Sequence, residues 1–339
     1  MSIVPSTVSA EPAVVDRGGL PAILGWRTYI LSAVIIGSTT LILAEAAVRM
    51  VCLPLSSLHE AVMLVKDQRG YVPMPGARIR FRGMHSVLSE LVIWQVNAQG
   101  IRAEGWIESA KLPGKFRIAT YGDSETFGWS VNLEDTFQRR MERLDRRLEV
   151  INFGVPGYNI SNISEHVERT VLPFRPELLI YLINPNDLDS PLEISTLTIH
   201  SELARRICVL YEAFKERDMV RERRSPARIR AFVAELVRMT EFCEKNYIPL
   251  AVALIAGQDR SLLEVDPSLK RYFLDAPDCS HRVFDVSEIF GRYQHEDCHL
   301  SREGHEQLAK FFVSHLSHEQ AGVDLAVRAS RSRAERRSF

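Results

Sequence analysis

From Phe116 onward, short apolar strands alternate with amphipathic helical segments, and this alternation limits the possible folds more than any other feature of the chain. Five runs have the length and apolar character of buried parallel strands: Phe116–Tyr121, Val150–Phe153, Leu178–Ile183, Leu250–Ile255 and Val283–Val286. Apolar residues spaced three and four apart predict helices over Thr136–Leu148, Ser201–Arg217, Ala227–Lys245 and Arg302–Leu316. The repeated strand–helix order predicts a three-layer α/β/α domain with a mostly parallel, five-stranded sheet.

The composition agrees with a globular domain and excludes several other classes. The chain has 339 residues, 46% of them hydrophobic and 25% charged, so it is long enough for one large core plus appendages. Its 42 basic and 43 acidic residues nearly cancel, and no nucleic-acid partner is expected. The five cysteines have no C-x-x-C spacing, which argues against a disulfide framework and against a structural zinc site.

A long uncharged stretch precedes this domain. No residue from Thr28 to Ala44 is charged, and the length is at the lower limit of the roughly 17–25 residues that a membrane-spanning helix needs. Trp26 and Tyr29 suit a membrane interface, and Glu45 and Arg49 are spaced to pair as the helix leaves the bilayer. Residues 28–44 are therefore expected to hold the chain in a membrane.

Two other interpretations of this stretch stay open. Ala44-Glu45-Ala46 has the small-x-small form of a signal-peptide cleavage site, although the leader is long for such a peptide. A buried helix of a soluble domain is the other alternative, but the stretch lacks a polar face. We favour an uncleaved single-pass anchor with the α/β domain in the periplasm or otherwise outside the cytoplasm, although positive residues on the two sides nearly balance.

The predicted organisation has five parts. A flexible leader spans residues 1–26 and the transmembrane segment spans residues 27–50. A neck broken by Pro54, Pro73, Pro75 and Gly76 follows over residues 51–115, and the α/β domain covers residues 116–318. Residues 319–339 form an Arg-rich tail that is expected to be disordered.

Four loops at predicted strand ends carry the chemistry. Gly122-Asp123-Ser124 follows the first strand and leaves the Ser124 hydroxyl where open α/β sheets bind ligands, although the same tripeptide is common in ordinary turns. The other three loops contain Gly154–Asn159, Asn184–Asp187 and His295–Ser301. Together they supply the nucleophile, imidazole, carboxylate and oxyanion donors of an acyl-transfer site. These parts require no metal, and no cofactor is expected.

In this order the loops resemble the SGNH/GDSL hydrolase family, from about Asn97 to about Leu316. The matching blocks are Gly122-Asp123-Ser124 with Thr126-Phe127-Gly128, then Asn152–Tyr158, Asn186-Asp187, and His299-Leu300-Ser301 with Gly304-His305. The stretch Asn97–Arg102 also looks like the lead-in of membrane-anchored members. The resemblance implies a flavodoxin-like α/β domain.

The resemblance also implies roles for single residues. Ser124 would be the nucleophile, His299 the general base, and the oxyanion hole would comprise the Ser124 and Gly154 backbone N–H groups and the Asn186 amide. Two positions depart from the family pattern. The usual acid three residues before the histidine is Glu296 here, with Asp297 as the alternative triad acid. Asn184 replaces the usual glycine of the third block, and His305 is expected to be structural.

These roles imply a membrane-anchored serine esterase or O-acyltransferase that forms an acyl-enzyme on Ser124. The resemblance to membrane-anchored members implies an O-acetylated envelope or extracellular glycan as the substrate. A lipid ester, such as a lysophospholipid, and a catalytically inactive glycan-binding or scaffold protein of the same fold are the alternatives. An α/β-hydrolase fits less well, because Thr126 occupies the second glycine position of its Gly-x-Ser-x-Gly elbow. Neither a P-loop nor G-x-G-x-x-G follows the first strand.

Overall fold

A computed structural model describes residues 26–51, 64–82, 91–189, 201, 203–204, 207, 224–275, 282–295 and 299–317. The chain divides into two compact units, Met1–Val51 and Cys52–Phe339. The expected tail over residues 319–339, and all of the expected leader except Trp26, lie outside the described residues. So does most of the helix expected over Ser201–Arg217.

The described part of the first unit is one helix, α1 (Trp26–Val51). Its segment Trp26–Val48 is long and apolar enough to cross a membrane, and none of its most apolar window is buried within the structure. The length and composition of this segment also fit a signal sequence, because signal sequences near the N-terminus meet the same two criteria. The expected apolar helix is therefore present, and it extends beyond the predicted residues 28–44 at both ends.

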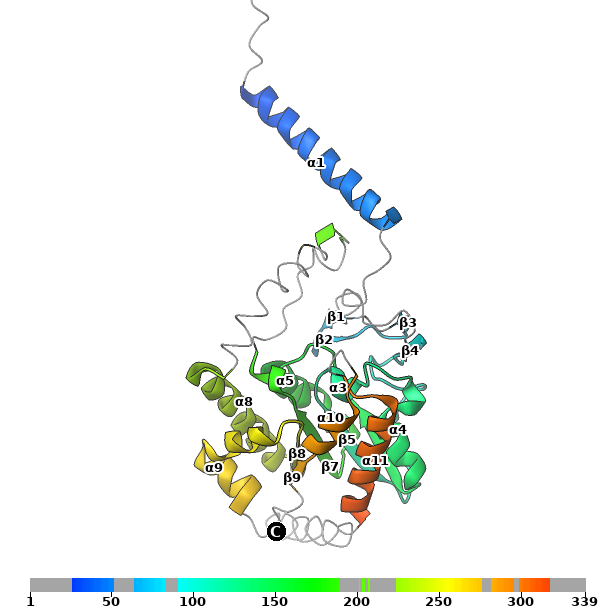
Figure 1. Cartoon of the computed structure of the whole chain (residues 1–339), viewed down its shortest axis with the longest axis vertical. Coiled ribbons are helices and arrows are strands. Elements are labelled where there is room, and N and C mark those ends of the chain that lie inside the picture. The colour runs from blue at the N-terminus through cyan, green and yellow to red at the C-terminus, as the bar shows by residue number, and fades with distance from the viewer. Residues whose placement is uncertain are drawn as a thin grey trace, which may run out of the picture. The chain divides into compact units, whose positions relative to one another are not determined.

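The second unit is organised around a parallel five-stranded sheet (Figure 1). Its strands are β5 (Phe116–Tyr121), β6 (Leu148–Asn152), β7 (Leu178–Ile183), β8 (Leu250–Leu254) and β9 (Val283–Asp285). Their spatial order, β6-β5-β7-β8-β9, is the 2-1-3-4-5 order of flavodoxin-like folds. The predicted fold class is confirmed.

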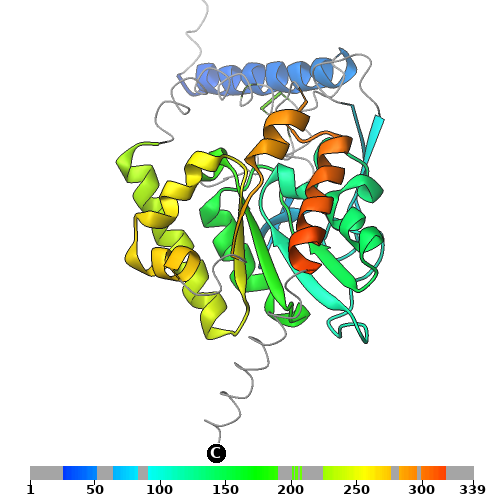
Figure 2. The same ribbon diagram turned by 60° about the horizontal axis from the view of Figure 1, so that its bottom comes forward.

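Helices cover both faces of this sheet, as Figure 2 shows. One apolar core joins the sheet to α4 (Phe137–Leu144), α10 (Ser287–Tyr293) and α11 (Arg302–Ser317). The other joins it to α5 (Ile160–Thr170) and α8 (Pro226–Lys245). Neighbouring residues of one strand enter opposite cores, as Ile118 and Ala119 of β5 do, because successive side chains of a strand point to opposite faces.

Short elements connect these layers. They are α3 (Ser124–Phe127), α9 (Pro267–Lys270), the 3₁₀ turns Leu133–Asp135, Leu172–Phe174, Pro185–Leu188 and Gly257–Glu264, and the π-helical turn Arg271–Asp275. β5 and β7 have the predicted bounds, whereas β6 begins at Leu148, a residue that was expected to end the preceding helix. The helix ends at Leu144 because a turn follows, in which the Asp145 carboxylate accepts the Arg147 N–H at 2.9 Å.

The predicted neck contains two antiparallel hairpins, β1 (Leu64–Asp67) with β2 (Gly70–Pro73), and β3 (Arg78–Arg82) with β4 (Leu91–Gln95). It belongs to the same compact unit as the sheet, so no structural division is found at the expected boundary after residue 115. Arg117 of β5 is one residue that joins the neck to the sheet. Its buried guanidinium pairs with Glu149 at 2.9 Å and also donates to the backbone carbonyl of Ser109 in the neck. The neck is thus part of the domain's packing.

Candidate active site

Ser124 is the first residue of α3, directly after β5 and the Gly122-Asp123 turn. Asp123 is the N-cap of this helix, and its carboxylate accepts the backbone N–H of Glu125 at 3.0 Å. Ser124 is 7% exposed and lines a cavity. The structure therefore places the predicted nucleophile at the carboxyl end of β5, as expected.

Two glycines let α3 lie this close to the sheet. A Cβ atom on Gly154, in the loop after β6, would stand 2.3 Å from the backbone nitrogen of Phe127. A Cβ atom on Gly122 would stand 2.1 Å from Thr126 Oγ1. Any larger residue would displace the helix that carries Ser124, so both positions require glycine.

His299 lies beside the serine although 175 residues separate them. Its Nε2 atom is 3.0 Å from Ser124 Oγ, within the hydrogen-bond reach that proton transfer requires. The structure thus brings the predicted nucleophile and the predicted general base together.

The backbone of His299 and Ser301 is held by hydrogen bonds to the residues at the end of α10. The His295 N–H donates to the His299 carbonyl at 2.8 Å, and the Ser301 N–H donates to the Tyr293 carbonyl at 2.7 Å. These bonds join Tyr293 and His295 to Ser301 and His299, and the described residues 293–295 and 299–301 are called the hydrogen-bonded loop below.

Glu125, the residue after the nucleophile, also holds this loop. Its buried side chain accepts the backbone N–H of Leu300 at 3.1 Å through Oε2. This contact fixes the peptide next to His299 to the helix that carries Ser124. The contact cannot be predicted from the sequence, because nothing in the local pattern around Glu125 indicates a partner 175 residues away.

The two candidate acids, Glu296 and Asp297, lie outside the described residues, as does Cys298. Their placement relative to His299 therefore stays a prediction.

Asn186 and Asn184 both bind the buried carboxylate of Asp123. Their side-chain amides donate to Asp123 Oδ2 at 2.8 Å and 2.9 Å respectively, and both residues line the cavity. Burial raises the pKa of Asp123, while hydrogen bonds from Asn186 and the Glu125 N–H act in the opposite direction. The Asn184 side chain, which replaces the family's usual glycine, thus shares an acceptor with the predicted oxyanion donor.

Asp187 is a second buried carboxylate beneath this loop. It accepts the hydroxyl of Tyr181 at 2.6 Å and the backbone N–H of Asn184 at 2.8 Å. Burial, together with the nearby charge of Asp123, raises the pKa of Asp187 well above its usual range. These bonds fix the 3₁₀ turn Pro185–Leu188, which presents Asn186 to the cavity.

Gly154 is placed less favourably for its predicted role. Its N–H donates to Asn152 Oδ1 at 2.9 Å, and Gly154 is not among the residues that line the cavity. An oxyanion would have to displace that bond. Gly157 of the same loop is exposed and has a φ of 80°.

The cavity at Ser124 has a volume of about 490 Å³. Its polar lining comes from Ser124, Glu125, Asn184, Asn186, Ser287, Gln294 and His299, and its apolar lining from Pro185, Ile255, Ala256, Phe290 and Gly291. A space of this size lies within the range of small-molecule sites.

Helix α10 supplies one wall of this cavity. Its residues Ser287, Phe290 and Gly291 line the cavity at spacings of three and one, so they share one face of the helix, and Gln294, which caps the C-terminal end, continues this wall. This helix is not among those predicted from the sequence. The spacing of Ile289, Phe290 and Tyr293 was a signal for it, but the segment has only seven residues.

His305 has the structural role that was expected. It is buried in α11, its Nδ1 accepts the Phe137 N–H at 3.3 Å, and its ring stacks on the Phe137 ring. Burial lowers the pKa of His305 to about 3, so the ring is neutral. Among the residues that the structure describes, no group of three His, Cys, Asp or Glu side chains is arranged to hold a metal ion.

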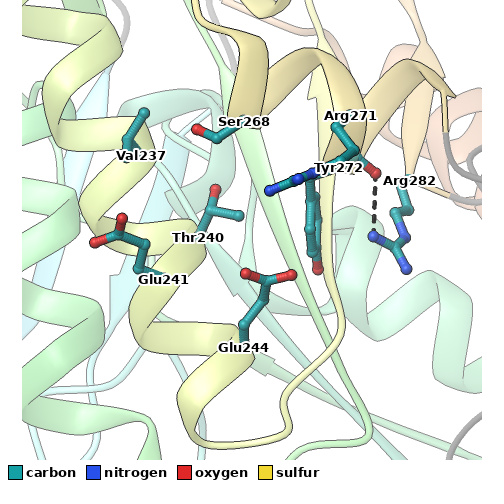
Figure 3. A pocket seen from close by; sticks show the side chains of 8 residues that line it. All are labelled: Val237, Thr240, Glu241, Glu244, Ser268, Arg271, Tyr272 and Arg282. Atoms are coloured by element: carbon teal, nitrogen blue, oxygen red, sulfur yellow. Dashed lines mark hydrogen bonds between the residues drawn. The ribbon is translucent and has the colours of Figure 1, made fainter.

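A second cavity, of about 210 Å³, lies against α8 and is lined by none of these residues (Figure 3). Val237, Thr240, Glu241 and Glu244 of α8 line it, together with Ser268, Arg271, Tyr272 and Arg282. The Arg282 guanidinium lies 4.1 Å from the centre of the Tyr272 ring and donates to the Tyr272 carbonyl at 3.0 Å. This lining contains no serine–histidine pair, so the cavity at Ser124 is the candidate active site.

Comparison with known proteins gives similarity in structure only. No protein-family model matches the chain, and no curated protein sequence matches it. A psychrotrophic esterase from Pseudoalteromonas is similar with 10% identity and a TM-score of 0.40, over 61% of this chain and 100% of the esterase. An acetylxylan esterase from Geobacillus stearothermophilus is similar with 15% identity and a TM-score of 0.37, over 61% of this chain and 96% of that enzyme.

A member of the lipolytic G-D-S-L family from Veillonella parvula is also similar, with 14% identity and a TM-score of 0.36, over 58% of this chain and 96% of that protein.

Proposed function

We propose that this chain is a serine-dependent ester hydrolase or O-acyltransferase that forms an acyl-enzyme on Ser124. The observation that carries the proposal is the 3.0 Å distance between Ser124 Oγ and His299 Nε2 beside a cavity. A serine hydroxyl is a weak nucleophile unless a base within hydrogen-bond reach accepts its proton.

The reaction would follow the usual order of acyl transfer. His299 accepts the Ser124 proton while Oγ bonds to the ester carbonyl carbon, and the carbonyl oxygen becomes an oxyanion. The intermediate then expels the alcohol, which takes the proton from His299. Water, or a sugar hydroxyl in a transferase, next attacks the acyl-enzyme with His299 again as base, and Ser124 is regenerated.

The proposed oxyanion donors are the Ser124 and Gly154 N–H groups and the Asn186 amide. Ser124 is at the start of α3, where backbone N–H groups lack partners within the helix. The Asn186 amide nitrogen carries two hydrogens, and the bond to Asp123 uses one of them. Gly154 is the weakest member, because its N–H already has an acceptor in Asn152.

We propose an O-acetylated envelope or extracellular glycan as the substrate. Amide and hydroxyl side chains of Asn184, Asn186, Ser287 and Gln294 line the cavity and suit a hydroxylated substrate. The apolar residues Ile255 and Phe290 leave room for an acyl group. Lipid esters are the alternative substrate class that the tests below separate.

We further propose that α1 stays uncleaved, spans a membrane once, and holds the catalytic domain outside the cytoplasm. The length and apolar composition of Trp26–Val48 support the span.

Serine reactivity tests the proposed chemistry. We expect the full-length protein to hydrolyse p-nitrophenyl acetate and to be labelled at Ser124 by a fluorophosphonate, because the His299 contact activates the hydroxyl. Ser124→Ala should abolish the labelling and lower turnover at least about 10³-fold. Ser130→Ala is the matched control. A wild-type protein that neither hydrolyses short or long esters nor reacts with the probe contradicts the proposal and favours a binding protein.

The triad acid is tested by separate isosteric substitutions. Glu296→Gln should lower turnover more than Asp297→Asn, because Glu296 occupies the position of the family's acid. The size of the larger loss should be about 10⁴-fold, as for a lost orienting carboxylate. Turnover numbers of both variants at pH 8 provide the measurement, and the reverse order would assign the role to Asp297.

Gly291 allows a test of what the α10 wall contacts. A Cβ atom there meets no atom within 4 Å, so Gly291→Leu should narrow the cavity without displacing the backbone. If the wall holds the acyl group, kcat/KM for p-nitrophenyl octanoate should fall about tenfold or more while that for the acetate stays within about twofold. Gly105→Leu is the control, because Gly105 also has open space but does not line the cavity. If the ratio of kcat/KM for the octanoate to kcat/KM for the acetate is the same in Gly291→Leu as in wild type, the α10 wall does not contact the acyl group.

Topology is tested by protease access. Protease added to cells stripped of their outer layers should digest the catalytic domain, and the mature chain should retain residues 26–51, as peptide mass analysis can check. Protection of the domain would contradict the proposed orientation. A chain that begins after Ala46 would identify the helix as a signal sequence.

A further inference from the structure

The imidazole of His299 lies against an indole. The ring centroids of His299 and Trp129 are 5.6 Å apart, and the ring planes differ by 23°. Trp129 is buried and follows Gly128, the C-cap of the helix that begins with Ser124. Rotation of the imidazole about its Cβ–Cγ bond would lose this stacked contact, so Trp129 restricts the ring orientation that directs Nε2 toward Ser124.

Trp129 is held by a residue of the neck. The Trp94 ring, in β4, is 4.2 Å from the Trp129 ring, and its indole N–H donates to the Trp129 carbonyl at 2.7 Å. Trp94 is fully buried and also packs edge-on against Phe127. Trp94 of the hairpin β3–β4 thus contacts both the ring and the backbone carbonyl of Trp129.

Arg102 holds the backbone on both sides of Trp129. Its buried guanidinium donates to the Phe127 carbonyl at 3.3 Å and to the Val131 carbonyl at 2.9 Å, and it lies 4.5 Å from the centre of the Phe127 ring. The peptide that carries Trp129 is therefore fixed at its two flanks and at its own carbonyl.

These residues form a small core of their own. Val92, Trp94 and Val96 of the neck pack with Phe127 and Trp129, separately from the two cores on the faces of the sheet. This third core connects the neck to His299 through Trp129, whereas the two larger cores pack against the faces of the sheet. Loss of one of its rings is therefore expected to affect His299 more than the sheet.

We infer that Trp129 is a positioning residue for the general base, and that Trp94 of the neck keeps Trp129 in place. This inference rests on the proposed function. The neck then acts in catalysis, because it sets the angle at which His299 Nε2 meets the serine hydroxyl. Misplacement of a catalytic group by about 1 Å can cost on the order of 10²-fold in rate.

The test compares Trp129→Leu, Trp129→Phe and Trp94→Phe in the full-length protein. Trp106→Leu is the control, because Trp106 belongs to the same neck but is 64% exposed. The measurements are kcat and KM for p-nitrophenyl acetate, the rate of fluorophosphonate labelling, and the thermal unfolding midpoint.

We expect Trp129→Leu to lower kcat and the labelling rate about 10- to 100-fold while KM changes less than about threefold. Trp129→Phe should recover most of the loss, because it retains a ring face for the imidazole. Trp94→Phe keeps a ring but loses the N–H donor, so it should give an intermediate loss. Trp106→Leu should resemble wild type.

Wild-type kcat in a folded Trp129→Leu protein would overturn the inference, and so would a Trp129→Phe variant that is no better than Trp129→Leu. If Trp129→Leu does not fold, Trp94→Phe decides, and an unchanged kcat in that variant overturns the inference. These outcomes leave the wild type active. A wild-type protein without hydrolysis or labelling would instead overturn the proposed function, and the positioning role with it.

Discussion

The contact between the four-residue helix α3 and its surroundings is the constraint on which the candidate site depends. A helix of one turn is not stable by itself, because too few hydrogen bonds offset the cost of nucleation. Here the ends are satisfied from outside the helix: Asp123 caps the start, and the Gln138 side chain donates to the Thr126 carbonyl at 2.8 Å. The Phe127 carbonyl accepts from Arg102 and from Asn152, both at 3.3 Å. Ser124 is therefore held by side chains from the neck, from α4 and from β6.

The sequence predicts the sheet well, because its strands are short, mostly apolar runs separated by helical patterns, as in a buried parallel sheet. One error in the predicted element bounds arises where a single residue satisfies two patterns. Leu148 continues the helical spacing of Leu144 and also begins the apolar run of β6, and only the Asp145 turn decides between them. Helix α5 was missed because its sequence, ISNISEHVERT, is largely polar, and Asn159 was read as part of a loop although it caps the helix.

Some residues of the candidate site can be predicted from the sequence and others cannot. Ser124, His299 and Asn186 follow from the order of motifs along the chain, and the structure places all three at one cavity. Glu125, Trp129 and the α10 wall do not follow, because their contacts join segments far apart in sequence and local spacing carries no record of such pairs. The neck shows the same limit: its prolines and glycine indicated a spacer, whereas Trp94 and Arg102 are buried against the segment after α3.

The hydrogen-bonded loop between α10 and α11 has a consequence for altering this protein. One wall of the cavity and the flanks of His299 belong to a single stretch of chain, joined by the His295–His299 and Tyr293–Ser301 bonds. Selection for a new substrate at the Gln294 end of that wall would therefore act on the histidine as well, and gains in specificity there would trade against turnover. Ser287, at the opposite end of the same helix face, is two helical turns from the loop and is the position where the two properties are best separated.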